Sequence, residues 1–255
     1  MSEQKHSIPA DGEILSKRTY PKEYKGPKPI VKQIEMLAKK FKLSPDRTIK
    51  FVEKVLPSLT LPSGAEGWFA FPSVNALADR FFPKVVGSEK RLCEATKFVL
   101  TNFKDSRKFT QGSVLIRMSE NGKFVRKNNF DNFRLSTKTL FALSILTQQQ
   151  KGDIWIVGGQ FGNLHAGRSI ERTRELMVGS EFGAHTIAVG SMLITHPERL
   201  ASHKDLWPEI PGDEYGPGSS TYGMFFSFGN GIFFNKSLVG SPTEQYGSVS
   251  LFLPK

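Results

Sequence analysis

A short apolar run that leads into glycines is the feature that most constrains this chain. Residues 154–157 read Ile-Trp-Ile-Val, which predicts a strand, and the glycine-rich loop 158–167 then turns the chain away from it. Residues 168–175 return to helical spacing. Glycines let backbone amides approach phosphate, and helix N-termini attract anions. Residues 152–200 are therefore the first place to look for a phosphate-binding or catalytic site.

The loop nevertheless completes no nucleotide-binding motif. Residues 158–162 read Gly-Gly-Gln-Phe-Gly, which is not G-x-G-x-x-G because Gln160 stands at the second glycine position and the helix begins several residues too late. No Gly-Lys-Ser/Thr follows, as a P-loop requires, and no Gly-x-Ser-x-Gly elbow supports a serine hydrolase. A tight strand-to-loop exit is therefore the prediction.

The polar side chains after the strand are compatible with two kinds of chemistry. His165 and His185 are the candidate catalytic residues, the second lying one helical turn after Glu181 if that segment is helical. An anion could instead be clamped by three arginines, Arg168, Arg172 and Arg174. Acidic residues of the same helix can also neutralise them, which is the commoner outcome for a solvated face. The histidine spacing contains no zinc-ligand pair and Cys93 is the one cysteine, so we expect no metal and no cofactor.

Helical and strand periods are mixed along the chain without a regular βαβ alternation, which predicts an α+β fold. Apolar residues at helical spacing predict a helical N-terminal part, with helices over residues 29–41, 45–56, 73–81 and 88–103. A very apolar helix over residues 136–147 is expected to be buried on most sides. We expect β-hairpins at about 112–127, where Asn121-Gly122 specifies a tight turn, and at about 223–235.

The expected domain organisation follows from composition. Residues 1–28 are rich in Lys, Pro, Ser and Glu and contain few apolar residues, which predicts a flexible basic arm. Residues 29–150 form a basic helical and hairpin part, and residues 151–255 form a mixed α/β part. We expect these two parts either to be separate or to make one continuous globular domain.

Charge is distributed unevenly between these parts. The chain of 255 residues has a net charge of +11. Lysine and arginine outnumber aspartate and glutamate by 27 to 14 over residues 1–150, whereas the ratio is 8 to 10 over residues 151–255. A field of one sign over part of a protein attracts polyanions, so nucleic acid is the first partner to consider.

The hairpin at 112–127 concentrates this charge. Its turn places Arg117 directly opposite Arg126, where the two like charges repel each other unless an anion lies between them. Phenylalanines alternate with cations around it, and a single-stranded nucleic acid uses cations for its phosphates and rings for its bases. The expected nucleic-acid-binding residues are Arg117, Lys123, Arg126, Lys127, Phe130, Phe133 and Arg134.

The sequence therefore favours a protein that binds single-stranded DNA or RNA by phosphate neutralisation and aromatic stacking. Two alternatives stay open: a hydrolytic enzyme with a His/Arg site around loop 158–167, and a self-assembling, coat-like protein that forms a homo-oligomer. No run approaches the roughly 20 apolar residues of a membrane helix, and the N-terminus lacks a signal-peptide core. We expect a cytoplasmic protein without membrane contact.

Overall fold

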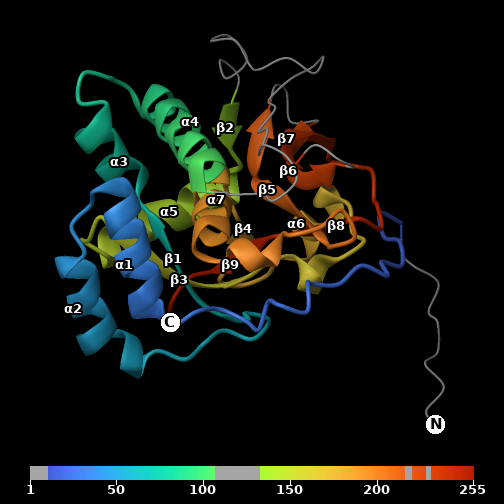
Figure 1. The fold of residues 1–255 in the computed structure, drawn as a ribbon, viewed down its shortest axis with the longest axis horizontal. Helices are drawn as coiled ribbons and strands as arrows, with labels where there is room; N and C mark the ends of the chain where they lie inside the picture. The colour runs from blue at the N-terminus through green and yellow to red at the C-terminus, as the bar shows by residue number, and fades with distance from the viewer. Residues whose placement is uncertain (1–10, 107–132, 216–219, 228–230) are drawn as a thin grey trace.

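The protein has an α+β fold, as the mixed periods predict. The computed structural model describes residues 11–106, 133–215, 220–227 and 231–255. Its helices are α1 (Ile30–Phe41), α2 (Asp46–Lys54), α3 (Val74–Phe81), α4 (Ser88–Ser106), α5 (Thr137–Gln149), α6 (Ile170–Leu176) and α7 (Thr186–Thr195), with single 3-10 turns η1 (Leu56–Ser58), η2 (Asn163–His165) and η3 (Pro197–Arg199). Its strands are β1 (Gly67–Pro72), β2 (Phe133–Leu135), β3 (Ile154–Gln160), β4 (Glu181–Gly183), β5 (Trp207–Tyr215), β6 (Ser220–Ser227), β7 (Gly231–Leu238), β8 (Tyr246–Ser248) and β9 (Ser250–Phe252). Helices α1–α3 lie at one end of the molecule and strands β5–β8 at the other (Figure 1).

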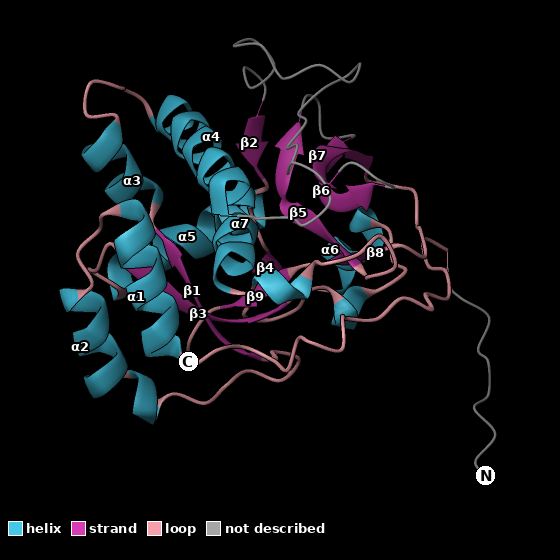
Figure 2. Cartoon of the chain, in the orientation of Figure 1, coloured by secondary structure: helices cyan, strands magenta, loops and turns pink. Residues whose placement is uncertain are grey.

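The first sheet contains the strand predicted from the apolar run. Its order is β1-β3-β9-β4, and all neighbours are antiparallel. Every residue of β3 is buried. Helices α1 and α7 pack against β1, and Figure 2 shows both in front of this sheet. On one edge of β3, β1 pairs with it from Ile154 to Gly159, whereas on the other edge β9 pairs only with its last three residues. On that second edge the side chains of Gln150 and Thr48 hydrogen-bond to the backbone of Ile156 and Ile154, so the backbone is paired there while the apolar side chains pack in the core.

The second sheet contains the hairpin expected at about 223–235. Its order is β2-β5-β6-β7, and β8 pairs with β5 in parallel. The pairs of β6 with β7 run from Ser220 opposite Leu238 to Ser227 opposite Gly231, which confirms this hairpin. The hairpin expected at 112–127 lies outside the described residues.

Both sheets combine strands from the two parts of the chain that composition distinguishes. In the first sheet β1 pairs with β3, and in the second β2 pairs with β5. The sheets are also joined directly, because the amide of Gly212 donates to the carbonyl of Ala184 at 2.9 Å. Each of the two sheets is therefore built from both parts of the chain.

Helix α5 differs from its sequence expectation. Its buried face includes Ala142, Leu143 and Leu146, but Leu140 is 52% exposed and Phe141 is 66% exposed. The expectation that this helix is buried on most sides is therefore wrong. A helix at the surface of a domain packs along one stripe, whatever the apolar content of its other side.

Residues 11–28 also differ from their expectation as a flexible arm, because they lie against the domain. The amide of Ile14 donates to the carbonyl of Gly167 at 2.7 Å, and the amide of Leu206 donates to the carbonyl of Thr19 at 3.0 Å. The ring of Tyr24 is buried and packs edge-on against Phe161. From composition alone we expect the entropy cost of ordering this segment to keep it flexible. Backbone hydrogen bonds and the burial of one large aromatic ring offset that cost.

Helix α7 is the buried centre of the fold, and Asp213 of β5 satisfies its N-terminus. All ten of its residues are buried. The backbone amide of Thr186 donates to both carboxylate oxygens of Asp213 at 3.2 Å, and its hydroxyl donates to the same group. Burial raises the pKa of Asp213 to about 7, although the hydrogen bonds from Thr186 and the charge of Arg174 act in the opposite direction.

Among the described residues we find no helical segment that combines the length and the apolar character of a membrane span.

Replacing Asp213 tests this arrangement. Asp213→Ala leaves a buried amide without an acceptor, so we expect the free energy of unfolding to fall by about 1–3 kcal/mol. As a control, Asp79→Ala removes a carboxylate that pairs with Arg91 at the surface, and we expect a loss of at most about 1 kcal/mol. Urea denaturation followed by circular dichroism measures both. Equal losses would show that Asp213 is not needed at the end of α7.

Candidate functional site

The glycine-rich loop after β3 is shaped by close packing. Gly162 has φ 116°, and a Cβ atom there would lie 2.4 Å from the carbonyl oxygen of Gly247. Gly167 has φ 76°, and a Cβ atom there would lie 2.0 Å from the carbonyl oxygen of Ile14. Only glycine fits both the backbone conformation and the space. The glycines therefore serve the tight exit from the strand that the sequence predicts.

The amides of this loop already have acceptors inside the protein. The carboxylate of Glu66 accepts from the amide of Phe161 at 3.2 Å, and the hydroxyl of Tyr20 accepts from the amide of Asn163 at 2.8 Å. The side-chain oxygen of Gln160 accepts from the amide of Gly162 at 2.5 Å. A phosphate-binding loop needs amides that point at an open site. These amides point at side chains of the chain itself, so the loop is not a phosphate cradle.

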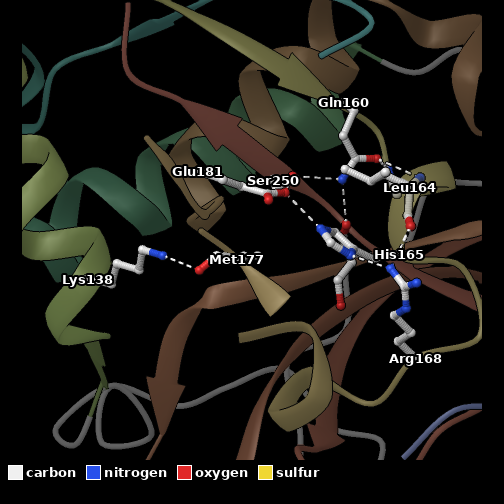
Figure 3. Close-up of polar contacts among 10 residues, drawn as sticks. Lys138, Gln160, Leu164, His165, Arg168, Met177, Glu181 and Ser250 are labelled. Carbon is white, nitrogen blue, oxygen red and sulfur yellow. Dashed lines mark hydrogen bonds and ion pairs between the residues drawn. The ribbon is translucent and has the colours of Figure 1, made fainter. Parts of the chain in front are cut away.

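A buried polar cluster lies beneath the loop (Figure 3). Nε2 of His165 lies 2.7 Å from Oε1 of Glu181, and the hydroxyl of Ser250 donates to the same oxygen at 2.5 Å. The side-chain Nε2 of Gln160 donates to the Ser250 hydroxyl at 2.9 Å. On the other side of the imidazole, Nη1 of Arg168 lies 3.0 Å from Nδ1. The cluster joins η2, β3, β4 and β9.

The hydrogen-bond partners in the cluster define the tautomer of His165. A guanidinium only donates, so Nδ1 of His165 accepts from Arg168 and the ring hydrogen lies on Nε2, which donates to Glu181. His165 is 2% exposed and Glu181 is 6% exposed. Both nitrogens of the imidazole are hydrogen-bonded, and the ring is closed off from solvent. The cluster therefore holds the loop in place against β4 and β9.

His185 lies outside this cluster. Glu181 belongs to a strand and His185 precedes α7, so the single helical turn that would have placed them together does not exist. The His185 ring packs edge-on against Phe71 of β1, and its Nδ1 has no hydrogen-bond partner in the part of the chain that the structure describes. No group of three or more potential metal ligands occurs in that part either.

The three arginines proposed as an anion clamp are paired with carboxylates. Nε of Arg168 lies 3.3 Å from Oε1 of Glu13, and Nε of Arg172 lies 3.2 Å from the same oxygen. Nη1 of Arg174 lies 3.7 Å from Oε1 of Glu214. An external anion would have to compete with these carboxylates, which makes the three arginines a poor anion site.

Two of the seven expected nucleic-acid-binding residues are described, and neither is freely available. Phe133 is 3% exposed and belongs to the hydrophobic core, so it cannot stack on a base. Arg134 is exposed, but its Nε lies 3.0 Å from Oε2 of Glu214. The other five lie outside the described residues: Arg117, Lys123, Arg126, Lys127 and Phe130.

The structure instead brings out a row of cations that the sequence analysis did not single out. Arg47, Lys50 and Lys54 are spaced by three and four residues, so they share one face of α2. Nη1 of Arg47 donates to the carbonyl of Lys151 at 3.2 Å, which brings a fourth cation alongside. We call these four residues the basic stripe. All four are exposed, and none forms an ion pair with another described residue. The helical spacing was the signal in the sequence that could have revealed three of them.

No protein-family model, curated protein or solved structure matches this chain. We therefore infer function from the positions of its own side chains.

His185 provides a test of the buried interior by pH. Burial lowers its pKa to about 3, so the folded protein keeps the ring neutral where the unfolded chain protonates it. Above the unfolded pKa of about 6.5 the ring is neutral in both states, so its burial has no pH-dependent cost. As the pH falls from about 6.5 toward 3, only the unfolded chain takes up the proton, and the free energy of unfolding falls. We expect His185→Phe, which keeps an aromatic ring against Phe71, to lose less stability than the wild type between about pH 7 and about pH 4. Urea titrations at the two pH values measure this, and equal losses would contradict it.

Proposed function

We propose that the protein binds single-stranded nucleic acid and that the basic stripe on α2 neutralises its phosphates. The observation that carries this proposal is the contrast between two sets of cations. The arginines of α6 and the turn before it pair with carboxylates, whereas the stripe has no carboxylate partner among the described residues. A cation without an internal partner attracts an external anion most strongly.

The dimensions of the stripe suit a chain of phosphates. Arg47 and Lys54 are separated by seven residues, which corresponds to about 10 Å along a helix. Lys151 adds a fourth cation next to Arg47. A linear row of cations follows a phosphate backbone better than it surrounds a single small anion.

The hairpin expected at 112–127 would supply the stacking in this proposal. Its cations, with Phe130 beside them, combine charge and an aromatic ring over a short stretch. Stacking on an aromatic side chain requires an unpaired base, which is why the proposal specifies a single strand. Two surfaces would then contribute to binding: the stripe would contact phosphates, and the hairpin would stack on bases.

Charge reversal on α2 tests the stripe. For the double variant Lys50→Glu, Lys54→Glu, the slope of log K against log salt should fall by about 0.7 for each phosphate that is no longer neutralised, and affinity at low salt should fall with it. The matched control is Lys17→Glu, Lys204→Glu, which changes the net charge equally at two exposed lysines outside α2. Fluorescence anisotropy with a labelled single-stranded DNA and its RNA equivalent at two or more salt concentrations measures both. Equal losses of affinity in the two variants would show that net charge, rather than the position of the stripe, determines binding. Wild-type binding that is absent or independent of salt would contradict the proposal.

The hairpin is tested separately. We expect the double variant Arg117→Glu, Arg126→Glu to abolish binding to the same oligonucleotides, because it replaces two neighbouring cations with anions. Circular dichroism and thermal denaturation confirm that the variant is folded. An undiminished affinity would show that the hairpin does not bind the nucleic acid, and the stripe would remain as the proposed binding surface.

A further inference from the structure

A pocket of about 380 Å³ is lined by residues of α3, α4 and α5 and of strands β2 and β3. This volume falls within the range of about 300–1,000 Å³ that is usual for ligand pockets. The apolar part of its wall is formed by Val74, Leu92, Leu135, Leu140, Leu143 and Trp155. Asn75, Ser88, Ser144 and Thr147 add neutral polar groups, and Glu89 and Arg134 add one charge of each sign. An apolar cavity with a few polar groups suits a ligand that has apolar faces and polar edges.

The pocket is accessible from the surface. Leu140 lines it and is half exposed, and Ser144 on the next turn of α5 is exposed as well. Trp155 lies deeper, where its indole nitrogen donates to the carbonyl of Gln150 at 3.1 Å. This hydrogen bond holds the ring in place, so a ligand would meet a fixed aromatic side chain.

Two hydrogen bonds connect the pocket with the basic stripe. The ammonium of Lys151 donates to the carbonyl of Thr147, a lining residue, at 3.0 Å. The carbonyl of Lys151 in turn accepts from Arg47 at 3.2 Å. Lys151 of the stripe therefore contacts a residue of the pocket wall, and Arg47 contacts Lys151. A ligand whose ring entered the pocket could keep a phosphate against them.

We propose that this pocket receives an unstacked base of the single strand whose phosphates lie along the basic stripe. The inference rests on the proposed function and adds the place where a base is held. A base has apolar faces that pack against leucine, valine and tryptophan, and polar edges for the amide of Asn75 and for the hydroxyl oxygens of Ser144 and Thr147. These two hydroxyls already donate to carbonyls of α5, so they accept from the base. Its phosphate remains outside, beside Lys151 and Arg47. A purely apolar ligand would leave those cations unused.

Filling the pocket tests the inference. Ser144→Phe places a ring at the mouth from an exposed helix position, and Gln148→Phe introduces the same residue at an exposed position of α5 that does not line the pocket. The probes are a labelled 12-nucleotide oligothymidylate and the same oligomer with abasic residues. We expect the wild type and Gln148→Phe to bind the thymidylate at least about tenfold more tightly than the abasic oligomer, since one stacked base contributes roughly 1–3 kcal/mol. Ser144→Phe should reduce this preference by about tenfold, keep any part of it that the hairpin contributes, and keep its salt dependence.

The outcomes separate this inference from the proposed function. If Ser144→Phe keeps the full preference and the salt dependence, the pocket holds no base and the proposed function stands. If the wild type shows no salt-dependent binding, the proposed function fails. The pocket is then judged by calorimetric titration with thymidine 5′-monophosphate. Binding that Ser144→Phe loses and Gln148→Phe keeps supports the pocket, and absent or equal binding in all three proteins overturns it.

Discussion

A helix with no exposed residue must have both ends satisfied from inside the protein, and α7 imposes this requirement on the fold. At its N-terminus, Asp213 of the second sheet accepts from Thr186. At its C-terminus, the ammonium of Lys28 donates to the carbonyl of Thr195 at 2.8 Å, and the amide of Lys28 donates to Nε2 of His196 at 2.8 Å. One buried helix thereby ties a distant strand and the N-terminal segment to the first sheet.

The buried guanidinium of Arg199 extends the same connection. It lies 3.9 Å from the ring of Tyr20 and donates to the carbonyls of Phe161 and Leu206. The hydroxyl of Tyr20 in turn donates to Glu66, whose carboxylate holds the loop after β3. Cations and anions of this region are therefore committed to holding segments together. The basic stripe lies outside that network, because none of its four cations forms an ion pair with another described residue.

Local rules predicted much of the fold because their causes act between near neighbours. The hydroxyls of Ser73, Ser136 and Ser169 accept from the first turns of α3, α5 and α6, and the first two of these helix starts were predicted. The apolar run became β3, and the expected hairpin became β6 and β7. The same rules failed for residues 11–28 and for the exposed side of α5, because packing against distant segments decides whether an apolar or extended stretch is covered.

The sequence by itself determined the α+β class, the absence of a standard nucleotide motif and the excess of positive charge in residues 1–150. Only the tertiary structure decided which charges remain available. Glu13 meets Arg168 and Arg172 from more than 150 residues away, and Ser250 meets Glu181 across 69 residues. Helical spacing can align three cations on α2, but it cannot tell whether a distant carboxylate will reach them. Coulombic pairing depends on distance in space, which the order of residues along the chain does not specify.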